Sequence, residues 1–186
     1  MKQEGIYEVV NRKRDTIIKN ACVGEVPPEY KVALERMEDY LHSQKKRCTI
    51  ERRYVLEMLY RHDWPIDITS LHERVCQIQG NVALTTVYNT LDLLVQLRLA
   101  RRIELVSHGM TFFERSLGLE PHGFVVCNEC GTLHHLRLNS LLPTLQTLLP
   151  AGFDPQDYTL QIHGLCEKCQ RALFRKKKKH SIQITK

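Results

Sequence analysis

The 186-residue sequence has no apolar run long enough to span a membrane, and its start, MKQEGIYEVVNRKRD, lacks the apolar core and cleavage site of a secretory signal. It also lacks a P-loop, a dinucleotide-binding glycine motif and an evident Ser/His/Asp arrangement. These absences argue against membrane and secreted proteins and against common enzyme classes. We therefore expect a cytoplasmic protein that is not an enzyme and has no membrane partner.

Acidic residues are missing from positions 175–186, which carry six Lys and Arg residues and so account for the whole net charge of +6. The remaining residues sum to zero. Residues 1–104 are mildly basic and residues 105–174 mildly acidic, so a domain boundary is expected near residue 105. The basic tail, residues 173–186, is interpreted as a disordered segment that adds nonspecific affinity for DNA.

Four of the seven cysteines form two Cys-x-x-Cys pairs, Cys127/Cys130 and Cys166/Cys169. Two such pairs can supply the four thiolates of one tetrahedral Zn²⁺ site, which would be structural because no coordination position stays open. A disulfide or a redox-active thiol pair is the competing interpretation. Metal is favoured because the pairs are matched, no secretory signal is present, and neither pair begins an obvious helix that would lower a thiol pKa.

Apolar periodicity predicts four helices in the first half of the chain, over residues 29–47, 49–64, about 67–79 and 84–99. Residues 1–28, which end in a Pro-Pro pair, form an extension that is a frayed helix or disordered. Short helices joined by tight turns are typical of a helix-turn-helix unit. Two strands, ARRIELV and MTFFER, follow the fourth helix and would form the wing of a winged helix.

The fourth helix turns its apolar residues inward, so Thr85, Tyr88 and Asn89 are expected on its outer face. Hydroxyl, amide and tyrosine side chains can reach base edges and phosphates in a DNA groove. An ordinary solvated helix face explains the same pattern equally well. The basic segment over residues 45–61, which includes Lys46, favours DNA because its local charge of +4 suits phosphate contacts.

The second half predicts strands at HGFVVC, TLHHLRL and DYTLQIHG, with a helix at SLLPTLQTLL between the second and third. The two cysteine pairs lie at strand ends. A small sheet of this kind has open edges that a two-fold partner can extend, so we expect a homodimer. The overall prediction is an α+β protein, with a winged helix-turn-helix domain over 29–115 and a small α/β dimerisation domain over 116–172 that contains the zinc site.

In these motifs the chain resembles the ferric uptake regulator family of bacterial metal and peroxide sensors. The resemblance extends from about residue 29 to 170 and rests on RCTIERRYVLEML, LTTVYNTLDLL, TFFERS, PHGFVVCNECGTLHHL and YTLQIHGLCEKC. It implies a homodimeric repressor that binds a palindromic DNA operator and holds a structural zinc on the four cysteines. The residues expected to contact DNA are Thr85, Thr86, Tyr88, Asn89, Lys46, Arg52, Arg53 and Arg101.

The resemblance also implies a second metal site in the hinge between the domains, for Fe²⁺, Mn²⁺ or a second Zn²⁺. Three residues match it as ligands: Glu114, His122 and His135. At other positions this chain departs from the family, with Phe124 in place of the second hinge histidine and Trp64 in place of the histidine before the third helix, two residues after His62. Phenylalanine and tryptophan cannot bind metal.

Two alternatives stay open at this point. His122 and His135 are equally well explained as polar residues of a half-exposed sheet. The protein then binds DNA without a regulatory metal. The second alternative is that the cysteines serve as a redox-responsive zinc/thiol switch, because oxidation of the thiolates would release the zinc.

Overall fold

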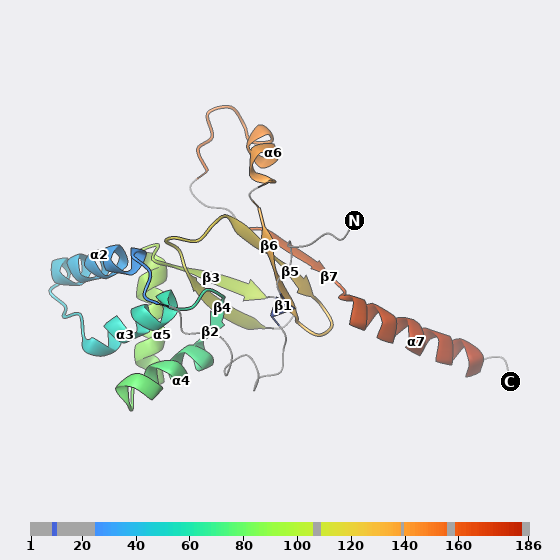
Figure 1. Cartoon of the computed structure of the whole chain (residues 1–186), viewed down its shortest axis with the longest axis horizontal. Coiled ribbons are helices and arrows are strands. Elements are labelled where there is room, and N and C mark those ends of the chain that lie inside the picture. The colour runs from blue at the N-terminus through green and yellow to red at the C-terminus, as the bar shows by residue number, and fades with distance from the viewer. Residues whose placement is uncertain (1–8, 11–24, 106–108, 139, 156–158, 184–186) are drawn as a thin grey trace. The chain divides into compact units, whose positions relative to one another are not determined.

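The computed structural model describes residues 9–10, 25–105, 109–138, 140–155 and 159–183, drawn as coloured ribbon in Figure 1. The chain divides into two compact units. One comprises residues 18–119, and the other comprises residues 1–17 together with 120–186. No helix among the described residues is long and apolar enough to cross a membrane.

The unit of residues 18–119 contains the four predicted helices: α2 (Glu29–Ser43), α3 (Ile50–Tyr60), α4 (Ile68–Gln79) and α5 (Leu84–Gln96). α4 has nearly the predicted bounds, whereas α2, α3 and α5 end three or four residues before the predicted C-terminal ends. Their apolar stripes meet in one core, in which Met37, Leu59 and Leu91 are fully buried. Ile78, near the C-terminal end of α4, is an exception among the apolar residues of the helix and is 53% exposed.

The N-terminal caps of the helices differ. The Asp67 carboxylate caps α4 by accepting hydrogen bonds of 3.0 Å from the backbone N–H groups of Thr69 and Ser70. Ala83, the N-cap residue of α5, makes no side-chain cap hydrogen bond. The recognition helix of the predicted motif therefore starts without a side-chain capping bond.

A three-stranded antiparallel sheet completes this unit, in the order β2 (Ile66–Asp67), β4 (Met110–Arg115), β3 (Ala100–Leu105). The β3–β4 hairpin is the predicted wing; residues 107 and 108 of its predicted turn lie outside the described residues. Strand β2 was not predicted. It is two residues long and pairs with β4, far along the chain, so no local pattern announces it. The helices and this sheet form a winged helix-turn-helix unit.

The second unit has a four-stranded sheet in the order β1 (Val9–Val10), β6 (Leu133–Arg137), β5 (His122–Cys127), β7 (Gln161–Gly164). β5 pairs antiparallel with β6 and parallel with β7. A short helix, α6 (Leu142–Thr147), connects β6 to β7. The predicted α+β class and the strand, strand, helix, strand order are confirmed.

Two segments differ from the sequence-based expectation. Within the extension of residues 1–28, Val9 and Val10 add a strand to the outer edge of β6, and residues 1–8 and 11–24 lie outside the description. At the other end, helix α7 (Glu167–Gln183) runs into the basic segment that was expected to be disordered. A run of lysines has good helix propensity, and α7 starts at the cysteine cluster, which gives the helix a fixed first turn.

Candidate metal centre and DNA-reading helix

The four predicted zinc ligands converge. The sulfur atoms of Cys127, Cys130, Cys166 and Cys169 all lie within 4.8 Å of one another, and the Cys130 and Cys166 sulfurs are 3.8 Å apart. Zn–S bonds of about 2.3 Å in a tetrahedron place sulfurs about 3.8 Å apart. The cluster therefore fits one tetrahedral zinc ion. No other group of three or more ligand side chains is found among the described residues.

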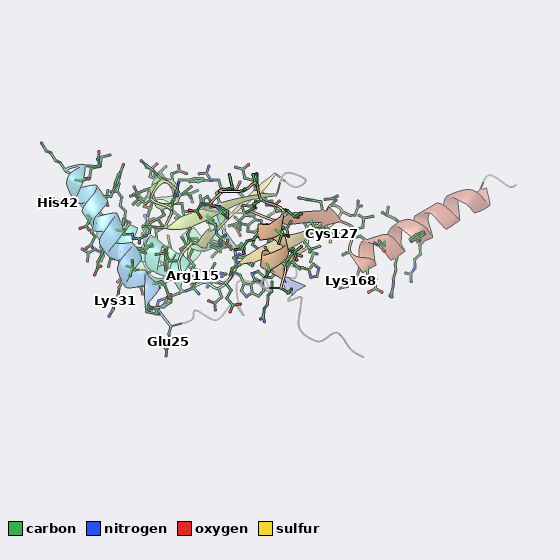
Figure 2. The ribbon with its side chains drawn as sticks, turned by 90° about the horizontal axis from the view of Figure 1, so that it is seen from above. Glu25, Lys31, His42, Arg115, Cys127 and Lys168 are labelled. Carbon is green, nitrogen blue, oxygen red and sulfur yellow. The ribbon has the colours of Figure 1, made fainter. Side chains whose placement is uncertain are left out.

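The elements of the second unit position these sulfurs. Cys127 is the last residue of β5, and Cys130 follows in a tight turn closed by the Gly131 N–H, which donates to the Cys127 carbonyl oxygen at 2.8 Å. Gly131 has φ of 65°, a backbone conformation that glycine adopts without strain. Cys166 and Cys169 come at the start of α7, which Figure 2 shows leaving the sheet near the labelled Cys127.

Hydrogen bonds prepare one thiol for metal binding. Burial raises the pKa of Cys127, but the backbone N–H groups of Cys166, Cys130 and Glu129 outweigh it and lower the pKa to about 6. The Cys166 N–H lies 3.3 Å from the Cys127 sulfur. Hydrogen bonding to Cys166 and the neighbouring thiols raises the pKa of Cys169 to about 12. One thiolate forms readily without metal, while Cys169 needs the charge of a cation to lose its proton.

The structure corrects one argument about these cysteines. The sequence suggested that neither pair begins a helix, but the Cys166 carbonyl accepts the first helical bond of α7, from Gln170 at 2.9 Å, so Cys166 is its N-cap. Thiolates are stabilised at this end of a helix. The missed signal was the Glu-Lys-x-Gln-Arg-Ala-Leu composition after Cys166, which has high helix propensity.

The outer face of α5 is as predicted. Thr85, Tyr88 and Asn89 are exposed, with Tyr88 at 48%, and Thr86 is half-buried. On the opposite face Val87, Leu91 and Leu94 are fully buried. The helix therefore presents two hydroxyl groups and an amide to solvent from a rigidly packed support.

Comparison with known proteins decides the family. The family model described as "Ferric uptake regulator family" matches residues 43–163, well over half of the chain. The chain belongs to the ferric uptake regulator family. The ferric uptake regulation protein of Campylobacter jejuni is 30% identical over 146 residues, which cover 76% of this chain and 90% of that protein. The Bacillus subtilis protein of the same name is 25% identical, covering 73% and 93%.

Solved structures agree on the fold. The Helicobacter pylori ferric uptake regulator, reported to have three functional metal-binding sites, superposes with a TM-score of 0.64 at 18% identity, covering 76% of this chain and 93% of its own. The Pseudomonas aeruginosa ferric uptake regulator, solved with manganese, gives 0.59 at 19%, covering 69% and 96%. As a family member, this chain is a DNA-binding transcriptional regulator.

The basic residues expected at DNA are placed as follows in this regulator. Lys46 is exposed, and Arg52 is half-buried with its guanidinium 3.3 Å from the Arg47 carbonyl oxygen. Two arginines are ion-paired: Arg53 with Glu38 at 2.8 Å, and Arg101 with Glu114 at 3.1 Å. The carboxylate of an ion pair neutralises much of the arginine's charge and so weakens its attraction for a phosphate. Lys46, which is exposed, is therefore the strongest candidate of this set for a phosphate contact.

Two of the expected hinge ligands lie together on the sheet of the second unit. The rings of His122 and His135 stack with centroids 4.5 Å apart, and the Phe124 ring meets both edge-on at 5.3 and 5.9 Å. His122 is buried, and its Nδ1–H donates to the Glu120 carbonyl oxygen at 2.7 Å. Two of the three expected hinge ligands therefore lie next to each other on one sheet.

Glu114, the third expected ligand, lies on β4 of the other unit. Its carboxylate is buried and ion-paired with Arg101, the residue directly opposite on β3. Any ion bound by Glu114 therefore competes with a guanidinium.

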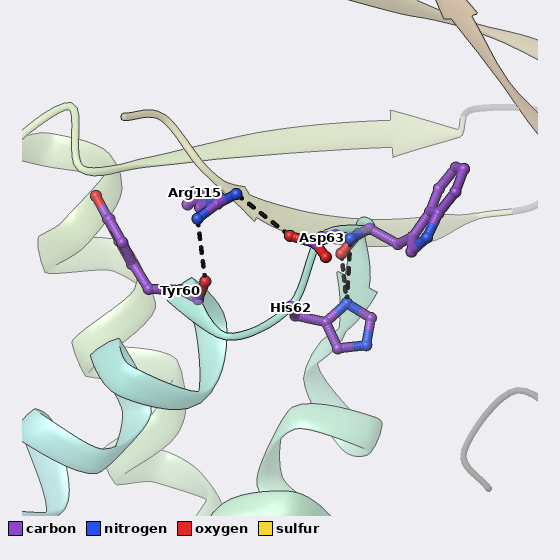
Figure 3. Close-up of polar contacts among 5 residues, drawn as sticks. Tyr60, His62, Asp63 and Arg115 are labelled. Atoms are coloured by element: carbon purple, nitrogen blue, oxygen red, sulfur yellow. Dashed lines mark hydrogen bonds and ion pairs between the residues drawn. The ribbon is translucent and has the colours of Figure 1, made fainter. Parts of the chain in front are cut away.

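A polar cluster at the end of α3 was missed by the sequence reasoning. Arg115, nearly buried, donates to the Tyr60 carbonyl oxygen at 3.3 Å and to the Asp63 carboxylate at 3.2 Å (Figure 3). His62 is 6% exposed, and its Nδ1–H donates to the Trp64 carbonyl oxygen at 2.7 Å. Burial lowers the pKa of His62, the backbone bond opposing it in part. Arg115 thus ties β4 to the C-terminal end of α3.

Proposed function

We propose that this protein is a homodimeric, sequence-specific repressor that reads a palindromic DNA operator with α5. The observation that carries the proposal is the exposed face of Thr85, Tyr88 and Asn89 on a helix whose other face is fully buried. A packed helix of this kind can enter the major groove without distortion, and the Asn89 amide can pair with an adenine edge. Lys46, Arg52, Arg53 and Arg101 are proposed to contact the phosphates.

Operator binding tests this function. Purified zinc-loaded protein should prefer a palindromic AT-rich duplex over random DNA, and the affinity should fall as salt rises. Asn89→Ala should weaken the specific complex by about 1–3 kcal/mol and relax discrimination at one base position, since a bidentate contact is lost. Gln146→Ala removes an exposed amide from α6 and serves as the matched control. Equal affinity for operator and random DNA would refute the proposal.

The four cysteines are proposed to hold a structural Zn²⁺. A zinc ion saturated by four thiolates supplies no open coordination position and contributes folding energy on the order of 10 kcal/mol. Cys127 and Cys130 then fix the end of β5, while Cys166 and Cys169 fix the start of α7. The convergence of four sulfurs at tetrahedral spacing supports this proposal. One zinc per chain is expected by elemental analysis.

The homodimer is proposed to form through the second unit. β7 is the outer strand of its sheet, and within the part of the chain that the structure describes nothing pairs with its free edge. Ile162 of β7 is also 47% exposed. A second copy that pairs with this edge would cover both. Sedimentation should give a dimer, and Ile162→Lys should weaken it; a monomeric wild type would contradict this part.

A regulatory ion is proposed at Glu114, His122 and His135. These side chains would offer one carboxylate and two imidazoles to Fe²⁺, Mn²⁺ or Zn²⁺, and the ion would supply a cross-link that changes operator affinity. The stacking of the His122 and His135 rings, with centroids 4.5 Å apart, supports this assignment. Metal is titrated into the zinc-loaded dimer while operator affinity is followed. Unchanged affinity would favour the alternative, a family member that binds DNA without a regulatory metal.

A thiol switch is the second candidate, because Cys166 begins α7 and the pKa of Cys127 is lowered to about 6. In this alternative, peroxide would oxidise the thiolates and release zinc. The two candidates differ in reactivity. A structural site predicts four thiols that resist alkylation until zinc is chelated, whereas a switch predicts zinc release and loss of operator binding at low peroxide concentrations.

A further inference from the structure

A second group of metal-binding atoms lies in the helix-turn-helix turn, away from the sites already described. The Cys76 sulfur is 3.3 Å from His72 Nε2, and the Val82 carbonyl oxygen is 2.7 Å from the same nitrogen and 3.7 Å from the sulfur. His72 and Cys76 are four residues apart on α4 and so lie on one face of the helix. Val82 ends the turn and directly precedes Ala83, the N-cap residue of α5.

The hydrogen bonds determine the protonation of the imidazole. A carbonyl oxygen only accepts, so the 2.7 Å contact requires that His72 Nε2 carries a hydrogen and donates it to Val82. The turn that leads into α5 is held to α4 by this bond. Because Ala83 offers no side-chain cap, the first turn of α5 has little other polar support.

We propose that His72 and Cys76 form a binding site for a thiophilic divalent cation of the Zn²⁺ type. Imidazole and thiolate are the ligands such cations prefer, and bonds of about 2.0 and 2.3 Å in a tetrahedron separate nitrogen and sulfur by about 3.5 Å, close to the 3.3 Å found. Both side chains are half-buried, so a cation can reach them. Water completes the coordination. Two protein ligands make an exchangeable site rather than a structural one.

A cation bound to His72 excludes the hydrogen bond from His72 to the Val82 carbonyl oxygen, because both use the Nε2 atom. The Cys76 thiol releases its proton to solvent, and the imidazole proton moves from Nε2 to Nδ1, so that Nε2 can bind the cation. The Val82 carbonyl then loses its donor, and the turn before α5 loses its tie to α4. A lost hydrogen bond of this kind should weaken operator binding about three- to tenfold. This consequence rests on the proposed role of α5, whereas the cation site itself does not.

Cobalt(II) added to the zinc-loaded dimer tests the site. A cobalt–thiolate bond produces a charge-transfer absorption band, whereas cobalt bound by the imidazoles and carboxylate proposed in the hinge does not produce this band. We expect one cobalt per chain with this band in the wild type. The band should be absent in Cys76→Ser and in His72→Gln, two near-isosteric variants. Cys48→Ser, which alters another half-buried thiol outside the zinc cluster, should keep it.

Operator affinity is measured on the same samples. Cobalt should weaken binding three- to tenfold in the wild type relative to Cys76→Ser, since any response of the hinge residues is common to both proteins. No band in the wild type, or a band that survives in Cys76→Ser or His72→Gln, would overturn the site. A band without a difference in operator affinity would overturn its link to α5. Neither result alters the preference for operator over random DNA that is measured without cobalt, and that preference tests the proposed function separately.

Discussion

Single residues decide how firmly the DNA-reading helix is built. α4 is capped by the Asp67 side chain, whereas Ala83, the N-cap residue of α5, makes no side-chain capping bond. The helix proposed to read DNA thus has the weaker start of the two helices in the motif, and its order depends on packing of Val87 and Leu91.

Ala83→Ser should therefore stabilise the protein. The serine hydroxyl can accept a hydrogen bond from a free N–H of the first turn, which raises the free energy of unfolding by about 1 kcal/mol. Urea denaturation followed by circular dichroism measures the change. Ala83→Val adds bulk without an acceptor and should give no gain. An equal effect of both substitutions would show that packing, not capping, limits this helix.

His62 should make stability depend on pH. Burial lowers its pKa in the folded protein, so the unfolded chain takes up a proton first as pH falls. Its contribution is complete above the unfolded pKa of about 6.5 and is lost as pH falls toward the folded value, by about 1.4 kcal/mol per unit of lowering. His62→Asn, which can keep the bond to Trp64, should flatten the stability curve between pH 7 and 5. Parallel curves for the two proteins would contradict this.

At the scale of elements, the sequence predicted what local pattern can carry. The four helices follow from apolar periodicity, and the β3–β4 hairpin from β-branched runs around a glycine. Strands β1 and β2 were missed because each is two residues long and exists only through a partner far along the chain. α7 was missed because a lysine run resembles a solvated tail. The four cysteines were predictable from spacing alone, whereas the Arg101–Glu114 pair required the β3–β4 register.

Zinc removal should act on one unit of the chain. Cys130→Ser leaves three thiolates, so β5 and α7 lose the link that we propose between them. Amide hydrogen exchange should quicken in β5, β7 and the first turn of α7, while α3 and α5 keep their protection because their core contains none of the four zinc-site cysteines. Cys48→Ser provides the cysteine-to-serine control. Uniform loss of protection over both units would show that the cluster supports the whole chain.

The whole molecule has an uneven charge. All of its net charge of +6 resides in residues 175–186, and the rest of the chain is neutral. A neutral body gives little long-range attraction to DNA, so we expect specificity and general affinity to come from different parts of the sequence. α5 is proposed to read the bases, and the basic end of the chain, which begins within α7, is proposed to supply attraction that is independent of sequence.

Removing residues 175–186 should therefore weaken binding to random and operator DNA by similar factors and leave their ratio unchanged. Each lost phosphate contact lowers the slope of log affinity against log salt by about 0.9 on duplex DNA, so a loss of several units is expected if most of the cations engage. Replacing Lys176 to Lys179 with glutamine keeps the chain length and should give most of the same effect. A change in the operator-to-random ratio would instead place the basic segment in sequence recognition, and an unchanged salt slope would remove it from DNA binding.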